Sequence, residues 1–491
     1  MLFTSYQQAK KKTDVRPKII KMSIRHFDIE IESGNPFANC KLDRQKYANV
    51  LLDLVNSYSS GFVLAINNKW GTGKTTFIKM WEQDLKDKEY QTVYFNAWEN
   101  DFENNPLTAL MGELKNITTT STEPKFKVAL KNASILSKHI APIIVQSIAD
   151  KYINTKEIKD AIVNVTKGIN DVFENEVNDY AKKKKGIIDF RKSLSEFITK
   201  TNKDKPLIFL IDELDRCRPD YAVSILEQIK HFFSVPNIVF VLSIDKIQLG
   251  NSVKGVYGSD RIDADEYLRR FIDIEYSIPE PESEIFHKYL YNYFEFDQFF
   301  ISENRKKFRE LENDKSNFQG ICSVLFSNGL ISLRQQEKIF SHSRLALRSF
   351  ESNNYVIPQL FLFLVYIKTI HEDLYQKINS KALTIEELQK DFFEIIKGKT
   401  NDDNERKVIQ LEVYLINTYN NYISFPYSRK RIYEYDNSTN KNKLLIKSII
   451  DKTENGDYFL SILENMSRYE SIEGVSIEHL LKKINLTEVF K

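Results

Sequence analysis

The sequence predicts an α/β fold in which a mostly parallel β-sheet is followed by a helical region. Short apolar runs alternate with stretches of helical periodicity as far as residue 281, which is the pattern of parallel strands joined by helices. Beyond that point the chain is amphipathic at helical spacing and shows no convincing strand. Glycine and proline are scarce, at 15 and 12 of 491 residues, about half of their usual share. This scarcity disfavours a turn-rich all-β fold.

The composition is that of a folded globular protein with nearly balanced charge. Hydrophobic residues make up 42% of the chain and charged residues 28%, which excludes wholesale disorder. The 70 basic and 68 acidic side chains leave a net charge of +2, so bulk electrostatics does not support a nucleic-acid partner. Cys40, Cys217 and Cys322 form no C-x-x-C pair, so neither a disulfide framework nor a cysteine zinc site is supported. A cytoplasmic location fits this cysteine usage.

No apolar run reaches the ~18 residues that a helix needs to cross a bilayer, so no transmembrane segment is expected. The longest candidates, residues 139–149 and 357–367, are too short, and the second is interpreted as a buried core helix. The basic stretch at the N-terminus lacks the apolar centre of a signal peptide and is interpreted as a flexible arm.

The expected elements follow one another in a regular order. An amphipathic helix is predicted at residues 42–57, with Asp43 in its first turn. Apolar runs typical of buried strands follow at residues 61–66, 92–96, 206–211 and 237–243. The expected organisation is a flexible arm (1–34), a core in two parts (35–117 and 187–281), a helical insertion between them (118–186), and a helical C-terminal lid or interaction region (282–491).

A phosphate-binding loop is predicted between the first strand and the helix that follows it. Backbone N–H groups of such a loop, together with the helix N-terminus, surround a phosphate. Lys74 is expected to reach the β- and γ-phosphate oxygens, and the Thr75 hydroxyl to bind Mg²⁺. The expected nucleotide-binding residues are Asn68, Trp70, Gly71, Thr72, Gly73, Lys74, Thr75 and Thr76.

One position of this loop departs from the usual pattern. The full motif has a glycine five residues before Gly73, and Asn68 stands there. Asparagine tolerates positive φ better than other non-glycine residues, so the turn is expected to survive. Trp70 is interpreted as a packing anchor in the loop.

An acidic strand end forms the second motif. The apolar run 207–211 ends in Asp212 and Glu213, which is the Walker B pattern. Asp212 is expected to hold Mg²⁺ through water, and Glu213 to act as general base toward the attacking water. Asp215 either shares that task or pairs with Arg216.

The end of the fourth predicted strand supplies two further candidates. Ser243 and Asp245 are expected beside the γ-phosphate, where a polar sensor belongs, although both also suit a structural cap.

Taken together, these motifs resemble a P-loop NTPase of the KAP family, in its soluble bacterial branch. The matching stretches are NPFANCKLDRQKYA (35–48), KWGTGKTTF (69–77), VYFNAWE (93–99), FLIDELDRCRP (209–219), FVLSIDK (240–246), EYLRRFIDIEYSIP (266–279) and GLISLRQQEKIF (329–340). The resemblance implies a core of the additional-strand, catalytic-glutamate type. Many family members carry transmembrane helices between the two Walker motifs, where this chain has a polar insertion.

The resemblance also implies what the protein does. It implies ATP and Mg²⁺ as ligands, nucleotide-dependent assembly or remodelling of a multiprotein complex, and a frequent role in bacterial anti-phage defence. A homo-oligomer or partner proteins of a defence complex are therefore expected. It further places a sensor-like catalytic arginine at Arg334. Arg269 and Arg270 are the alternatives, because they follow the closing helix of the core and from there can reach the site of a neighbouring subunit.

Several alternatives remain open at this stage. ATP is favoured over GTP because the chain has neither a D-x-x-G switch nor an N/T-K-x-D guanine motif. A nucleotide-binding scaffold without turnover is the first alternative, and Asn68 makes it plausible. A nucleic-acid-acting ATPase effector is the second, without support from the net charge, and a small-molecule kinase is the weakest.

Overall fold

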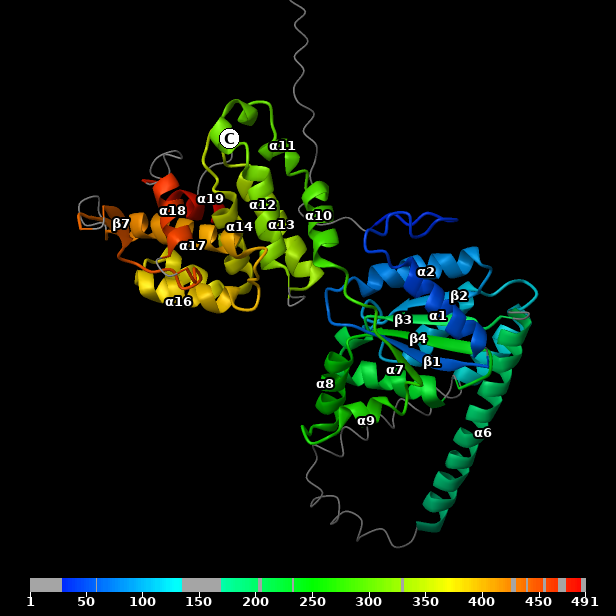
Figure 1. Cartoon of the computed structure of the whole chain (residues 1–491). Coiled ribbons are helices and arrows are strands. Elements are labelled where there is room, and N and C mark those ends of the chain that lie inside the picture. The colour runs from blue at the N-terminus through cyan, green and yellow to red at the C-terminus, as the bar shows by residue number, and fades with distance from the viewer. Residues whose placement is uncertain are drawn as a thin grey trace, which may run out of the picture.

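The fold consists of an α/β core and a helical region that lies to one side of it (Figure 1). The computed structural model describes residues 29–58, 60–134, 169–201, 205–231, 234–327, 331–424, 430–438, 440–453, 456–466 and 474–486. The first 28 residues of the expected arm and the apolar run at 139–149 lie outside these ranges. Among the described residues, no helix is both long and apolar enough to span a membrane.

A five-stranded parallel sheet forms the centre of the core. Its strands are β1 (Phe62–Asn67), β2 (Thr92–Asn96), β3 (Leu207–Asp212), β4 (Ile238–Ile244) and β5 (Ile274–Tyr276). The spatial order is β2-β3-β4-β1-β5, and every neighbouring pair is parallel. Because β4 lies between β1 and β3, one strand separates the phosphate-loop strand from the acidic strand. This arrangement confirms the predicted additional-strand core.

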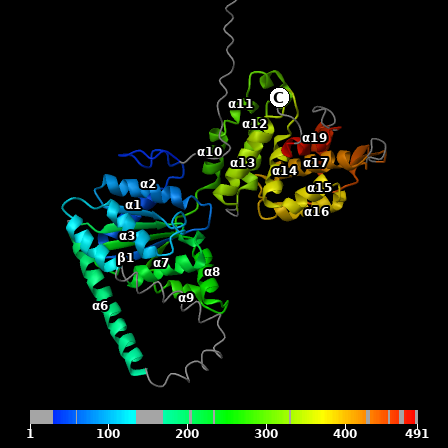
Figure 2. The ribbon, with the colours of Figure 1, turned by 180° about the vertical axis from the view of Figure 1, so that it is seen from behind.

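Helices cover both faces of the sheet (Figures 1 and 2). Side chains alternate along each strand, so Ile208 and Leu210 of β3 pack on one face, and Phe209 and Ile211 on the other. The first face is covered by α1 (Gln45–Ser57) and α2 (Lys74–Asp87). The second face is covered by α3 (Pro106–Asn116), α6 (Ile169–Thr201), α7 (Pro219–His231), α8 (Lys246–Tyr257) and α9 (Ala264–Leu268).

The helical region has a hydrophobic core of its own, which runs from Phe286 to Ile484. At its centre lies α14 (Pro358–Ile370), where every residue from Pro358 to Ile367 is buried, as the sequence predicts. The other elements are α10 (Ser283–Tyr293), α11 (Asp297–Phe300), α12 (Asp314–Leu325), α13 (Leu333–Leu347), α15 (Glu372–Asn379), α16 (Ile385–Ile396), α17 (Glu405–Ile423), β6 (Tyr433–Asp436), β7 (Lys441–Leu444), α18 (Asp457–Asn465) and α19 (Glu478–Ile484).

Three local expectations were wrong. The first helix begins at Gln45, and Asp43 lies before it with a φ of 49°, so it is not part of the first turn. Strand β5 escaped prediction because it is only three residues long. The antiparallel β6–β7 hairpin was not predicted because YEYD and KNKL are mostly polar. They lack the alternation of apolar and polar residues that is typical of a strand with one buried face.

Candidate functional site

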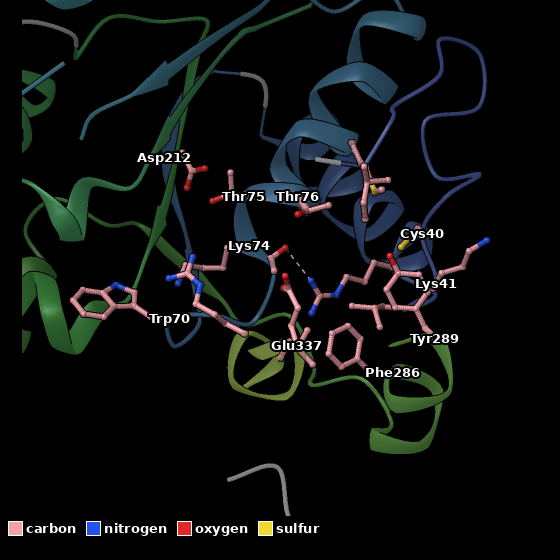
Figure 3. Close-up of a pocket in the computed structure, with 18 of the residues that line it drawn as sticks. Cys40, Lys41, Trp70, Lys74, Thr75, Thr76, Asp212, Phe286, Tyr289 and Glu337 are labelled. Atoms are coloured by element: carbon pink, nitrogen blue, oxygen red, sulfur yellow. Dashed lines mark hydrogen bonds between the residues drawn. The ribbon is translucent and has the colours of Figure 1, made fainter. Parts of the chain in front are cut away.

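A cavity of about 880 Å³ opens where the core meets the helical region. It is lined by the phosphate loop and the N-terminal half of α2, by the acidic end of β3 and the turn after it, by the helices α10 and α13, and by Ile29 and residues within 39–44. Figure 3 shows Asp212, Thr75 and Lys74 toward one side of this cavity, and Phe286, Tyr289 and Cys40 toward the other.

The phosphate loop has the backbone that its glycines allow. Gly71 and Gly73 have φ values of 77° and 80°, which disfavour any residue with a Cβ. A Cβ on Gly71 would come within 3.0 Å of the Arg334 Cβ. Lys74 is the first residue of α2, and its ammonium donates to the backbone carbonyls of Asn68 and, at 3.2 Å, Lys69. Burial lowers the pKa of Lys74, against the opposing effect of nearby carboxylates.

Asn68 supports the loop in a way that differs from the expectation. It has no positive φ, so tolerance of a left-handed backbone does not explain its presence. Instead its side chain donates to the carbonyl of Ile278 at 2.7 Å and accepts from the N–H of the same residue at 3.0 Å. The entry of the loop is therefore fastened to the segment that follows β5. Asn68 itself does not line the cavity.

The acidic end of β3 lies on the same side of the cavity as Lys74 and Thr75 (Figure 3). The buried Asp212 accepts a hydrogen bond from the Tyr94 hydroxyl at 3.2 Å. Glu213 adopts a left-handed backbone with a φ of 60°, a conformation that costs energy and is found often at functional sites. Its carboxylate forms an ion pair with Arg216 and lies 3.5 Å from the Asn96 amide. Burial raises the pKa of Glu213, and Arg216 offsets part of that effect.

Asp215 has partners other than the one considered in the sequence. Arg216 pairs with Glu213, so the alternative of an Asp215–Arg216 ion pair is wrong. Asp215 instead accepts hydrogen bonds from the Trp70 indole at 2.5 Å and from the backbone N–H of Asp245 at 2.9 Å. Burial raises the pKa of Asp215, and the nearby Lys74 offsets part of the rise. Trp70 is 43% exposed, so it positions a carboxylate and is not a buried packing anchor.

The two strand-end candidates differ in their surroundings. Ser243 lies in β4 between Ile66 of β1 and Asp212 of β3, and its buried hydroxyl has no hydrogen-bond partner within the described residues. Asp245 caps α8 by accepting from the backbone N–H groups of Ile247 and Gln248 at 3.2 and 3.3 Å. Neither residue lines the cavity.

The three candidate arginines are separated by the fold. Arg334 lies in the first turn of α13, lines the cavity, and donates its backbone N–H to the carbonyl of Gly71 at 3.2 Å. Arg269 and Arg270 are exposed and do not line the cavity, and Arg269 pairs with Glu266 at 3.2 Å.

The threonines of the phosphate loop also differ in whether they line the cavity. Thr75 and Thr76 line the cavity, whereas Thr72 does not and donates its hydroxyl to the carbonyl of Lys69 at 2.9 Å.

Sequence reasoning missed Arg44, which lines the cavity and contacts the phosphate loop. Its guanidinium donates to the carbonyls of Thr72 and Gly73 at 2.7 and 3.0 Å, and the residue is only 4% exposed. Burial lowers its pKa, and within the described residues it forms no ion pair with a carboxylate. A buried cation without a carboxylate suits an anionic ligand nearby. The only sequence signal was its place in the stretch NPFANCKLDRQKYA.

The residues present fit a nucleoside triphosphate with Mg²⁺. The glycine backbones leave space at the loop, Lys74 is a buried cation beside it, and the unpartnered Ser243 hydroxyl lies next to Asp212 in the sheet register. Thr75 and Asp212, a hydroxyl and a carboxylate, are oxygen donors of the kind that Mg²⁺ prefers.

The KAP family P-loop domain matches residues 44–345. No curated protein sequence matches the chain. Among solved structures the chain is similar to the ORC2 protein of Aeropyrum pernix in its ADPNP–ADP complexes, at 13% identity, over 86% of this chain and 93% of that chain, with a TM-score of 0.31. The family match spans more than half of the chain and includes the phosphate loop and the acidic end of β3. The chain therefore belongs to the KAP family of P-loop NTPases.

Proposed function

We propose that the protein binds and hydrolyses ATP at this cavity. The observation that carries the proposal is the convergence of Lys74, Asp212 and Glu213 on one cavity, although Lys74 lies 138 and 139 residues before the two acids. In this assignment Lys74 exchanges its carbonyl partners for β- and γ-phosphate oxygens. Glu213 takes the proton of the attacking water, with Asp215 as the alternative base.

Mg²⁺ fits between the loop and the acidic strand end. Thr75 and Asp212 would hold it, and the ion would neutralise charge on the β- and γ-phosphates. The backbone N–H groups of the loop, from Gly71 to Thr76, orient the phosphates. The buried hydroxyl of Ser243 is the sensor candidate supported by its position, whereas Asp245 acts through Asp215, to which it donates its N–H.

Arg334 is the cation that this proposal assigns to transition-state stabilisation within the chain. It belongs to the helical region, yet its backbone is hydrogen-bonded to the phosphate loop. Binding of a γ-phosphate between Lys74 and Arg334 would therefore draw α13 and the core together. This coupling is how hydrolysis would be transmitted to a partner or to a neighbouring copy.

Phosphate release and nucleotide binding test the proposal in parallel. We expect Glu213→Gln to bind ATP while its turnover falls by about 10²–10⁴, because the amide keeps the shape and loses the base. Lys74→Ala should fold but lose ATP affinity. Glu99→Gln is a matched control, because Glu99 is an exposed glutamate that does not line the cavity. Unchanged turnover in Glu213→Gln would move the base to Asp215, and ATP binding by Lys74→Ala as tight as the parent's would overturn the loop assignment.

We further propose that the nucleotide cycle assembles or remodels a multiprotein complex in bacterial anti-phage defence. The support for this role is the family resemblance together with the contact between Arg334 and the loop. Size measurements with and without ATP test the assembly. Phage plating on cells that express the parent or Glu213→Gln tests the defence role, which predicts protection by the parent alone.

A further inference from the structure

The cavity is chemically divided between a phosphate end and a nucleoside end. The loop and the acidic strand end supply the charged half, with Lys74, Asp212 and Glu213. The opposite half includes the apolar and aromatic side chains Leu42, Met80, Phe286 and Tyr289, with the basic Lys41 beside them. Aromatic and aliphatic surfaces of this kind suit the faces of a flat base. A nucleotide with its phosphates in the loop would therefore extend toward α10.

Glu337 lies between these two ends. It is a half-buried residue of α13, three positions after Arg334, so both side chains project from neighbouring positions on the helix surface. In the view of Figure 3, Glu337 lies below Thr76, with Lys74 toward one side and Phe286 and Tyr289 toward the other. The Glu337 carboxylate forms no hydrogen bond or ion pair with another residue in the part of the chain that the structure describes.

A carboxylate at this place requires a donor on the ligand. It repels phosphate oxygens, so it does not belong to the phosphate subsite. The segment of a nucleotide between its phosphates and its base is the ribose, whose 2′- and 3′-hydroxyls are two adjacent donors. Both oxygens of an ionised carboxylate are acceptors, so one carboxylate can accept a hydrogen bond from each of the two hydroxyls.

We propose that Glu337 accepts hydrogen bonds from the ribose hydroxyls and makes the site selective for ribonucleotides over deoxyribonucleotides. The inference rests on the proposed function, because it assumes that the phosphates occupy the loop. It assigns to the helical region a second contact with the nucleotide, since Glu337 and Arg334 belong to the same helix. Two residues of α13 then contact one nucleotide: Glu337 binds its ribose and Arg334 binds its γ-phosphate.

Equilibrium binding of ATP, 2′-deoxy-ATP and 3′-deoxy-ATP tests this assignment. The parent should bind ATP about tenfold or more tightly than either deoxy analogue, because a hydrogen bond to a charged group contributes about 1.5–3 kcal/mol. Glu337→Ala should weaken ATP binding most, because ATP loses both bonds, and should weaken each deoxy analogue less, because each analogue has only one bond to lose. The three affinities should then be nearly equal, so that the discrimination disappears. Glu337→Gln, which keeps one acceptor oxygen, should lie between them.

A matched control and the contradicting outcomes complete the design. Glu284→Gln alters an exposed glutamate of α10 whose carboxylate pairs with Lys288, and it should leave all three affinities unchanged. Equal binding of the three nucleotides by the parent, or an equal loss of all three in Glu337→Ala, would overturn the inference. So would a loss of ATP over GTP selectivity alone, because Glu337 would then read the base. If the parent bound no ATP, the proposed function itself would fail.

Discussion

The side-chain amide of Asn68 forms two hydrogen bonds with the backbone of Ile278, which lies 210 residues further along the chain. This pair joins the entry of the phosphate loop to the segment that leads from β5 into the helical region. Asn68 stands where the usual motif has glycine, and a glycine could form neither bond. The departure from the motif is therefore a tertiary contact, and it does not by itself argue against nucleotide turnover.

Restoring the consensus glycine should weaken this protein. In Asn68→Gly two part-buried hydrogen bonds are lost, so we expect the free energy of unfolding to fall by about 2 kcal/mol and ATP affinity to fall with it. Chemical denaturation and equilibrium ATP binding measure the two effects. Asn68→Ala loses the same two hydrogen bonds but retains a Cβ. Comparing it with Asn68→Gly therefore separates the effect of the lost bonds from the effect of the greater backbone freedom of glycine. An Asn68→Gly protein that is as stable as the parent and binds ATP more tightly would contradict the prediction.

Arg44 should act as a positioning residue for the phosphate loop. Its guanidinium holds the carbonyls of Thr72 and Gly73, which keeps the loop ordered with its N–H groups available. We expect Arg44→Ala to raise the Kd for ATP by about tenfold, the effect of losing roughly 1.4 kcal/mol, while kcat at saturation stays near the parent value. Arg44→Lys should recover little, because an ammonium lacks the planar fork of the guanidinium.

Binding and turnover measured separately check this prediction. A fall in kcat without a change in Kd would instead place Arg44 in the chemical step. Loss of thermal stability without a change in Kd would make it purely structural.

The location of the arginines predicts how their variants behave. Arg334 lines the cavity of its own chain, so Arg334→Ala should lower turnover at every protein concentration and leave ATP affinity mostly intact. Losses of 10³–10⁵ are of the order seen when such a cation is removed. Arg269 and Arg270 are exposed and outside the cavity, so they can reach a nucleotide only in a neighbouring chain.

Mixing experiments distinguish the two arrangements. If Arg269 or Arg270 acts between chains, mixing its alanine variant with Glu213→Gln should restore activity, whereas mixtures with Arg334→Ala should not. Full activity in all three alanine variants would remove every arginine from the mechanism.

Lys399 should make the stability of the helical region depend on pH. It is 7% exposed and donates to the Tyr366 hydroxyl at 2.7 Å and to the carbonyl of Leu325 at 3.0 Å. Burial lowers the pKa of Lys399 to about 8. Above that pH the folded lysine is neutral while the unfolded one, with a pKa of about 10.4, is still protonated, so stability rises with pH.

The expected size of this effect is roughly 2 kcal/mol between pH 8 and pH 10. The measurement is the difference in free energy of unfolding between the parent and Lys399→Met, because subtraction removes the contribution of other groups. The difference should be nearly constant below pH 7. A difference that stays flat up to pH 10 would show that Lys399 titrates normally.

Much of the core follows from short stretches of sequence. The strands β1, β3 and β4 are continuous apolar runs because both of their faces are buried, and this can be seen within seven residues. The phosphate loop and the acid pair at Asp212 are likewise local, since each is a backbone conformation or a strand end with its own residue types. From these features the sequence predicted a parallel sheet with a phosphate loop and an acidic strand end, and the family resemblance implied its additional-strand order.

The partners of the site residues were determined only by the tertiary structure. Arg44 holds the loop 28 and 29 residues away, Asn68 bonds to Ile278, and Trp70 donates to Asp215 across 145 residues. Such contacts depend on how distant segments pack, so they cannot be predicted from the periodicity or the motif of one segment. The open alternative of an Asp215–Arg216 pair was decided in the same way, because Asp215 accepts hydrogen bonds from the distant Trp70 and Asp245, while Arg216 pairs with Glu213.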